Sequence, residues 1–238
     1  MSTFIHPLRA LALLALVTVP LLPMNAAPAH AATREDYAEY FRELTARSNE
    51  YRSSRSFSRE RYSSATQRAI RELDDDIVED LPVPVLLGIS PSQINSDFGD
   101  PRGDGSREHE GQDLIAPRGA FIASPTDAVV IRTGDGSSSG IYVYTMNPGG
   151  ESFRYMHLDA IADGVKAGTV LEAGDLIGYV GDSGNAKGGV THLHFEIRDD
   201  GEAIDPYPRL TKEFTIEQRI AALTQVLEAL IKEQKKRD

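Results

Sequence analysis

The sequence predicts a mainly β domain, an antiparallel β-sheet that folds on itself and forms a groove, with α-helices on both sides of it in the chain. Short apolar runs alternate with glycine-rich turns through residues 94–210, whereas helical periodicity marks the regions before and after them. Short strands at this spacing are typical of antiparallel sheets. The 238 residues suffice for one such domain with extensions.

The first 31 residues have the pattern of a cleaved secretory signal peptide. Arg9 precedes an apolar run from Ala10 to Leu22, and Ala29-His30-Ala31 matches an A-x-A cleavage site. The run is short for a membrane span and contains Pro20. We therefore expect a protein that is secreted, either to the periplasm or cell envelope or beyond it, and an uncleaved anchor is the alternative.

Residues 32–80 are charged and are predicted to be helical. An apolar stripe at i, i+3, i+4 and i+7 begins at Tyr37 and ends at Leu44, and a similar pattern resumes from Ile70 to Val78. A Ser/Arg-rich stretch, residues 52–64, separates the two. The pattern indicates two helices or one interrupted helix, a stalk or lid without chemistry of its own.

Prolines mark residues 81–93 as an extended linker into the β domain, residues 94–210. The clearest strands of that domain are expected at 128–133, 141–146, 175–181 and 192–198, and turns at 134–140 and 147–150.

Residues 211–238 are predicted to form a C-terminal helix. Thr215 and Gln218 have the spacing of a capping box. One face carries six apolar side chains: Ile216, Ile220, Leu223, Leu227, Leu230 and Ile231. We expect this stripe to pack against the N-terminal helices, another protein or a second copy of the chain.

Composition excludes several classes of partner and site. The formal net charge of −11 argues against nucleic acid or an anionic membrane surface as a partner. The chain has no cysteine, so it has no disulfides, and any zinc ion must be held by histidines and carboxylates.

The histidines are concentrated in three short motifs. Of six in the chain, His6 and His30 lie in the segment that is predicted to be removed. The other four lie in HEGQD (109–113), RYMHL (154–158) and THLHFE (191–196). Imidazole and carboxylate ligands with spare imidazoles beside them are what a catalytic zinc site requires.

The third motif is predicted to be a strand whose alternate side chains share a face. His192, His194 and Glu196 would point one way, and Leu193, Phe195 and Ile197 would point into a core. One imidazole of this pair can bind a metal while the other faces a substrate. The alternative is a polar surface that happens to carry two histidines.

In the first motif, His109, Gly111 and Asp113 would share one face of an extended strand, and the glycine would leave room above it. The segment differs from the helical H-E-x-x-H motif of zinc proteases, because position 113 is Asp and Gly111 disfavours a helix. His157 is expected at the end of a strand. Each piece alone is compatible with an ordinary surface role, but one site explains all three.

Residues 94–210 resemble the lysostaphin-like (LytM-type, M23) zinc endopeptidases, which cut peptidoglycan peptides. The resemblance rests on SDFGDPR (96–102), HEGQD, YMHL, GVKAGTVLEAGDLIGYVGDSGNAKGG (164–189) and HLHFEIR. It implies a LytM-like, barrel-sandwich-type core and one zinc ion per chain, held by His109, Asp113 and His194. It also implies His157 and His192 as the catalytic imidazoles.

The chain departs from this family at two places. Ile141 stands where the family often has Asn, and GDGSR (103–107) stands where some relatives carry a tyrosine near the metal. Substrate contacts at these places would therefore differ, and Arg107 is a weak substitute for the tyrosine.

The mechanism that this resemblance implies depends on a proton transfer from a zinc-bound water to an imidazole. Zinc lowers the pKa of a bound water to about 7, which matches an imidazole base. His157 or His192 would then activate a zinc-bound water that attacks a peptide carbonyl, and Glu196 would orient a ligand or form an ion pair. Two alternatives are a non-hydrolytic regulator of another wall hydrolase and a carrier module of the biotinyl or lipoyl type with Lys166 as its acceptor.

Overall fold

The structure is a computed structural model that describes residues 62–237, apart from the side chains of residues 233, 236 and 237. The predicted signal peptide and the apolar stripe from Tyr37 to Leu44 lie outside the described residues. All the described residues belong to one compact unit, Arg52–Asp238. No helix within residues 62–237 is long and apolar enough to cross a membrane.

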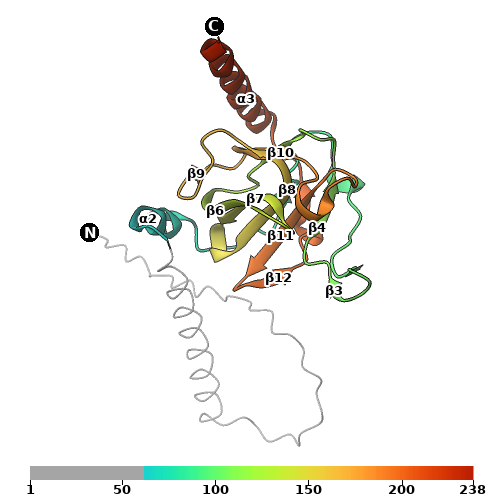
Figure 1. The fold of residues 1–238 in the computed structure, drawn as a ribbon. Helices are drawn as coiled ribbons and strands as arrows, with labels where there is room; N and C mark the ends of the chain where they lie inside the picture. Colours follow the sequence, from blue (N-terminus) through green and yellow to red (C-terminus); the bar gives the residue numbers. More distant parts are fainter. Residues whose placement is uncertain (1–61, 238) are drawn as a thin grey trace, which may run out of the picture. The chain divides into compact units, whose positions relative to one another are not determined.

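The described unit is built on one antiparallel sheet of nine strands (Figure 1), as the sequence predicts. Six strands follow the order β12-β11-β8-β7-β6-β9, β10 lies between β8 and β5, and β4 lies beside β11. The strands are β4 (Gln112–Ile115), β5 (Phe121–Ala123), β6 (Ala128–Gly136), β7 (Gly140–Met146), β8 (Ser152–Ile161), β9 (Val170–Leu171), β10 (Leu176–Val180), β11 (His192–Asp199) and β12 (Glu202–Ile204).

Two small sheets complete the β structure. β1 (Leu81–Pro82) pairs in parallel with β13 (Leu210–Lys212), and β2 (Pro101–Arg102) pairs with β3 (Arg107–Glu108) as an antiparallel hairpin. β1 and β13 flank the large sheet in the sequence, so their pairing joins the two ends of the domain.

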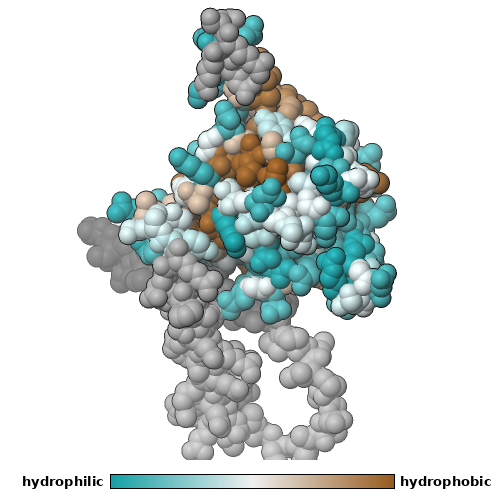
Figure 2. All heavy atoms as spheres, viewed as in Figure 1, coloured by the Kyte–Doolittle hydropathy of each residue, from teal (hydrophilic) through white to brown (hydrophobic). Residues whose placement is uncertain are grey.

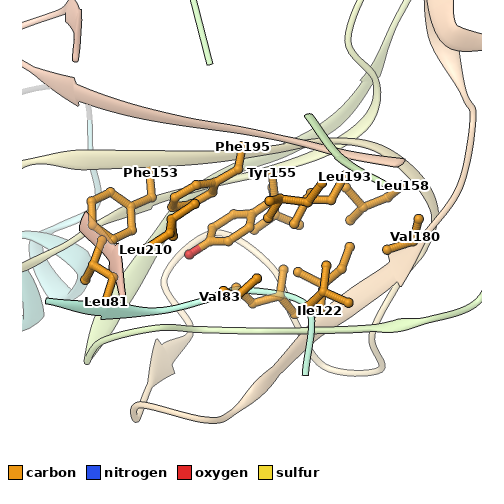
Figure 3. Packing of buried hydrophobic residues seen from close by; sticks show 14 of the residues in the cluster. Leu81, Val83, Ile122, Phe153, Tyr155, Leu158, Val180, Leu193, Phe195 and Leu210 are labelled. Carbon is orange, nitrogen blue, oxygen red and sulfur yellow. The ribbon is translucent and has the colours of Figure 1, made fainter. Parts of the chain in front are cut away.

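The core lies on one side of the large sheet (Figure 3), where large side chains from β8 and β11 meet. Phe195 contacts Phe153 edge to face, with ring centroids 5.4 Å apart, and lies 5.4 Å from the ring of Tyr155. All three side chains are at most 1% exposed. Apolar residues at alternate positions of these strands supply this core, as expected for strands with one buried face.

The segment before the sheet differs from its prediction in two ways. The helix there, α2, covers only Ser64–Glu72, so the apolar positions from Leu73 to Val78 are not helical. Residues 81–93, predicted to be an extended linker, are extended over β1 but packed against the domain. Leu81, Val83 and Val85 are at most 2% exposed, so this stretch contributes to the core.

The C-terminal helix, α3, covers Ile216–Arg237. Its predicted capping box is present, because Gln218 N donates to Thr215 Oγ1 (3.2 Å) and Thr215 N donates to Gln218 Oε1 (2.9 Å). Thr211 and Lys212, predicted to belong to the C-terminal helix, form the end of β13 instead. Ala222 and Phe214 are buried against Leu86 and Ala123, which anchors the first turns of the helix to the domain.

Candidate metal centre and groove

Strand β11 carries two histidines on the face opposite to the core, as its alternation predicts. Leu193, Phe195 and Ile197 are fully buried, whereas His192 and His194 line a groove on the other face. β4 pairs with β11 so that Asp113 is the direct partner of His194. This register brings a carboxylate to the imidazole across neighbouring strands.

His109 reaches the same point from the loop between β3 and β4. Its backbone is held on both sides, since His109 N donates to Asp100 O (2.9 Å) and Gly99 N donates to His109 O (2.8 Å). His109 thus precedes β4 rather than lying in it, and the prediction that residues 109–113 form one strand is wrong for its first part. His109 follows directly after the two-stranded hairpin β2–β3, so this hairpin positions the loop that carries it.

Gly111 provides the space between His109 and Asp113. A Cβ atom at this position would lie 2.8 Å from His194 Nε2 and 2.6 Å from the backbone oxygen of Phe195. These distances are shorter than carbon atoms tolerate, so the sheet and the histidine approach closely only because residue 111 has no side chain. The space that the sequence predicts next to Gly111 is occupied by the side chain of His194.

Three donor atoms converge at this point. His109 Nε2 lies 3.1 Å from Asp113 Oδ1 and 2.9 Å from His194 Nδ1, and those last two atoms are also 2.9 Å apart. A triangle with sides of about 3 Å has a point about 2 Å from all three corners, the distance at which nitrogen and carboxylate ligands bind zinc. This His–Asp–His group therefore fits a divalent ion, with further coordination positions open towards the groove.

The other ring nitrogens of both histidines are held by hydrogen bonds. His109 Nδ1 donates to the backbone oxygen of Asp97 (2.8 Å), and His194 Nε2 donates to Glu196 Oε1 (3.1 Å). Each bond turns the opposite nitrogen of the ring towards the donor group, so that this nitrogen can bind an ion once its proton is released. Glu196 is itself paired with Arg198 Nε (2.7 Å) and Arg154 Nη1 (3.2 Å), so it both orients His194 and forms ion pairs.

Arg102 supports the carboxylate of the group. Its Nη2 atom donates to Asp113 Oδ2 (3.0 Å), which leaves Oδ1 as the oxygen that faces the two histidines. Asp113 N donates to the carboxylate of Asp97 (3.2 Å), which fixes the backbone of the same residue. The sequence motif SDFGDPR contains both Asp97 and Arg102, but a sequence motif alone does not indicate these contacts.

The hydrogen bonds within the donor group favour a protonated His109 and an ionised Asp113. Burial lowers the pKa of His109, but hydrogen bonds with Asp113 and Asp97 outweigh it and raise that pKa to about 10. Burial raises the pKa of Asp113, but hydrogen bonds with His109 and His194 hold it well below its usual range. A cation that binds here replaces protons, as is general for histidine metal sites.

His157 and His192 lie beside the donor group without belonging to it. Their ring centroids are 5.1 Å apart, and the ring of His157 lies 5.8 Å from that of His194. His157 Nδ1 donates to Ser183 O (2.9 Å) and His192 Nδ1 donates to Val190 O (2.8 Å). In both rings, this leaves Nε2 available for proton transfer.

The position of His157 in the sheet differs from its prediction. It was expected at the end of a strand, but it lies in the interior of β8 at a left-handed backbone conformation, φ 63°. The pairing of β7 with β8 shifts register between Ile141 and Val143, next to this point. Burial and the neighbouring His192 lower the pKa of His157 to about 4, so its imidazole is neutral at pH 7.

A groove of about 1080 Å³ runs over the donor group and both further histidines. Its lining residues include Arg102 and Arg107 of the β2–β3 hairpin, and Asn185 and Ala186 of the glycine-rich segment 181–189. Tyr144 and Arg154 also line the groove, and the guanidinium of Arg154 lies 5.0 Å from the centroid of the tyrosine ring. This volume lies at the upper end of the about 300–1,000 Å³ of typical ligand sites.

Comparison with known proteins assigns the domain that bears this site. The site combines a His–Asp–His group that could hold a metal ion with two further imidazoles in a groove. Residues 107–206 match the description of peptidase family M23. The chain thus carries a peptidase family M23 domain.

Two curated relatives are similar over the same region. An L-Ala--D-Glu endopeptidase of Bacillus subtilis is 33% identical over 139 residues, which cover 54% of this chain and 42% of that protein. The peptidoglycan DD-endopeptidase ShyC of Vibrio cholerae is 33% identical over 95 residues, covering 40% and 21%. The chain therefore spans less than half of the length of either relative.

Solved structures show a similar match. A putative glycyl-glycine endopeptidase lytM from Ruminococcus gnavus is 32% identical, with 62% of this chain and 63% of that chain covered and a TM-score of 0.45. A zinc containing peptidase from Vibrio cholerae is 30% identical, with 51% and 36% covered and a TM-score of 0.43.

Proposed function

We propose that this domain is a zinc-dependent endopeptidase that hydrolyses the peptide cross-links of cell-wall peptidoglycan. The observation that carries the proposal is the triangle of His109 Nε2, Asp113 Oδ1 and His194 Nδ1, with sides of 2.9–3.1 Å, among the residues that line a groove of about 1080 Å³. The two relatives whose names describe peptidoglycan peptide cleavage support the choice of substrate.

The roles of the ligands follow from the chemistry of the donors. His109, Asp113 and His194 would hold the ion, and His109 and His194 are kept in the required tautomers by Asp97 and Glu196. Bound zinc supplies a Lewis acid that lowers the pKa of water to about 7 and polarises a peptide carbonyl. With two imidazoles and one carboxylate, the charge of the site stays positive when the ion is bound.

His157 and His192 would perform the proton transfers. Both present an Nε2 atom beside the donor group, with Nδ1 held by a backbone oxygen. One imidazole is neutral and accepts the proton of the attacking water at Nε2. The other would have to carry a second proton, on Nε2, in order to donate a hydrogen bond to the carbonyl oxygen as negative charge develops on it. The accepted proton then passes to the leaving amine, which completes the hydrolysis.

The substrate lies outside the cytoplasm, so the proposal includes export. The predicted signal peptide, residues 1–31, is consistent with secretion to the cell envelope or periplasm.

Digestion of purified cross-linked peptidoglycan tests the function. The chain that begins after the predicted cleavage site is incubated with peptidoglycan, with and without a chelator, and the fragments are identified by mass. New peptide ends that vanish with the chelator and return with added zinc are the expected result. No cleavage under any metal condition would instead favour the non-hydrolytic regulator.

A further inference from the structure

The glycine-rich segment 181–189 connects β10 to β11 and contributes Asn185 and Ala186 to the lining of the groove. Ser183 lies in the same segment, but it is not one of the residues that line the groove. Its hydrogen bonds are made to the neighbouring strands β7 and β8 instead. The role of this serine must therefore be sought in the sheet that carries the site.

The hydroxyl of Ser183 is inserted between β7 and β8. Its Oγ atom donates to Leu158 O (2.6 Å) and accepts a hydrogen bond from Ile141 N (2.9 Å). Ile141 and Leu158 are direct partners in the pairing of the two strands, and the register shifts next to them, between Ile141 and Val143. A side chain from a third segment thus joins the two backbones where the strands depart from regular pairing.

The backbone of the same serine holds His157. This histidine directly precedes Leu158 and donates from Nδ1 to Ser183 O (2.9 Å), so Ser183 bonds to two consecutive residues of β8. His192 is supported differently, because its Nδ1 atom donates to Val190 O, only two residues away in the chain. The carbonyl that holds His157 comes from 26 residues further along the chain, so its position depends on tertiary contacts.

The segment also has attachments that do not involve Ser183. Asp182 Oδ1 lies 2.5 Å from Arg118 Nη2, and Asn185 N donates to Ser138 O (3.0 Å) in the turn between β6 and β7. These contacts should keep the segment in place when the hydroxyl is removed. A variant without the hydroxyl should therefore still fold.

Removal of the hydroxyl should mainly affect the carbonyl that holds His157. This carbonyl belongs to the peptide plane between Ser183 and Gly184, and a glycine, here at φ 70°, restrains such a plane only weakly. Ile141 N and Leu158 O would each lose a hydrogen bond, and the strands must shift to replace it. Both effects would move the Ser183 carbonyl relative to the imidazole.

The polarity of the groove makes a fixed acceptor important. Its lining residues are mostly polar or charged, and Figure 2 shows hydrophilic surface around β3, which contributes to that lining. Water in such a groove can bond to either nitrogen of an imidazole. A protein acceptor at a fixed position determines which of the two nitrogens carries the proton.

We propose that Ser183 is a positioning residue for His157. Its hydroxyl fixes the Ser183 carbonyl, this carbonyl keeps the proton on Nδ1 of His157, and Nε2 then stays free to accept a proton beside the donor group. The consequence for cleavage rests on the proposed function, in which His157 takes part in proton transfer. Ser183 does not itself act on the substrate, because its hydroxyl is bonded between the strands and lies outside the lining of the groove.

Nuclear magnetic resonance of the histidine rings tests the proposal without any need for cleavage or bound zinc. The chain that begins after the predicted cleavage site has four histidines, and nitrogen spectra of its metal-free form show which ring nitrogen carries the proton. The His157→Ala variant identifies the signal of His157. Ser183→Ala removes the hydroxyl, whereas Ser183→Thr retains it.

The proton of His157 should lie on Nδ1 in the starting chain and in Ser183→Thr, and Ser183→Ala should give a mixture of tautomers. The matched control is Ser124→Ala. Ser124 is buried and its hydroxyl also donates to a backbone oxygen, that of Thr126 (2.7 Å), but it lies between β5 and β6, outside the lining of the groove. This control should keep the spectrum of the starting chain.

Three results would overturn the proposal. The first is a proton on Nε2 of His157 in the starting chain, which requires no substitution. The second is an unchanged His157 signal in a folded Ser183→Ala chain, as verified by circular dichroism. The third is an equal change in Ser124→Ala, which would indicate a general loosening of the domain.

Cleavage kinetics provide the second readout. Ser183→Ala should lower kcat by about 10- to 100-fold, as is usual when a bond that orients a functional histidine is lost, and should leave KM and zinc content unchanged. Ser183→Thr should recover most of kcat. A parallel loss of zinc, or no recovery by threonine, would contradict the positioning role. A starting chain that cleaves nothing would contradict the proposed function, and the tautomer of His157 would still decide the role of Ser183.

Discussion

His157 combines an unfavourable backbone conformation with a position next to the donor group. A non-glycine residue at φ 63° costs of order 1–3 kcal/mol, and such strain concentrates at functional sites. Two hydrogen bonds compensate for it, from His157 N to Ser139 O (2.9 Å) and from His157 Nδ1 to Ser183 O (2.9 Å). The bulged strand turns this imidazole towards the groove while its neighbours Tyr155 and Leu158 stay fully buried.

Two neighbouring histidines on β11 should respond differently to substitution. His194→Ala removes a member of the donor triangle, so we expect loss of bound zinc and of activity. His192→Ala leaves the triangle intact, so zinc content should stay while the cleavage rate falls about 10²–10⁴-fold, as for loss of acid–base catalysis. Metal analysis and fragment release measure both variants, and full activity in either would contradict the assigned roles.

Gly111→Ala should damage the site without touching a ligand. The added Cβ would lie 2.6 Å from Phe195 O and 2.8 Å from His194 Nε2, so β4 or the histidine must move. We expect a loss of about 1–3 kcal/mol in the free energy of unfolding, as for other overpacked sites, and weaker zinc binding. Thermal denaturation and zinc titration measure these effects.

Gly189→Ala is the matched control for that substitution. Its Cβ would approach only Ala186 O, at 3.1 Å, in an exposed loop. An equal loss of zinc affinity in both variants would contradict the explanation based on His194.

At the scale of the element, β11 shows how one strand serves two purposes. Phe195 is fully buried between Phe153 and Tyr155, whereas the residues on either side of it, His194 and Glu196, belong to the site. Packing of Phe195 therefore fixes the position of the neighbouring His194 side chain relative to the sheet. Sites on such rigid strands hold their ligands more precisely than sites on loops.

Phe195→Ala should destabilise the domain strongly. The substitution removes a fully buried ring, so we expect the free energy of unfolding to fall by about 3–5 kcal/mol. Chemical denaturation measures the loss. A change below about 1 kcal/mol would mean that the core on this face is less tightly packed than the contacts indicate.

Elements with strong periodicity were predictable from the sequence, and elements set by distant contacts were not. The alternation in HLHFEIR correctly gives the two faces of β11, and the spacing Thr215 to Gln218 correctly gives the start of α3. The apolar positions after Glu72 suggested a longer helix, but α2 ends there and Ile77 contacts Gly149 instead. Tertiary packing overrides local helical periodicity in such cases.

The residues of the site likewise include some that the sequence predicts and some that it does not. Histidine clustering in short motifs pointed to the residues that the structure brings together, namely His109, Asp113 and His194 with His157 and His192 beside them. The supporting contacts of Asp97 and Arg102 depend on how the β2–β3 hairpin folds over β4, and no periodicity in the sequence indicates that.

At the scale of the whole domain, the segment that precedes the large sheet contacts the segment that follows it. β1 and β13 pair in parallel, and Arg209 forms a bidentate ion pair with buried Glu151 while also donating to Val78 O. Apart from Glu151, the residues that make these contacts lie outside residues 107–206, the part that matches the family. The domain therefore depends on flanking segments that the family match does not include.

Leu81→Ala tests this dependence. Leu81 is fully buried in the main core although it precedes the family match by 26 residues. We expect a loss of about 2–5 kcal/mol in the free energy of unfolding, as for leucines in other cores. Ile216→Ala, at a 71% exposed position, is the control and should change stability by less than about 1 kcal/mol. Similar small effects in both would show that β1 is peripheral.

The central claim is that two imidazoles and one carboxylate hold a single zinc ion in the groove. X-ray absorption spectroscopy of the zinc-loaded chain, together with metal analysis, tests it most directly. We predict one zinc per chain, with nitrogen and oxygen ligands at about 2.0–2.2 Å, two of them imidazoles, and loss of this signal in the His109→Ala variant. A chain that binds no zinc, or one whose zinc spectrum is unchanged in that variant, would contradict the account.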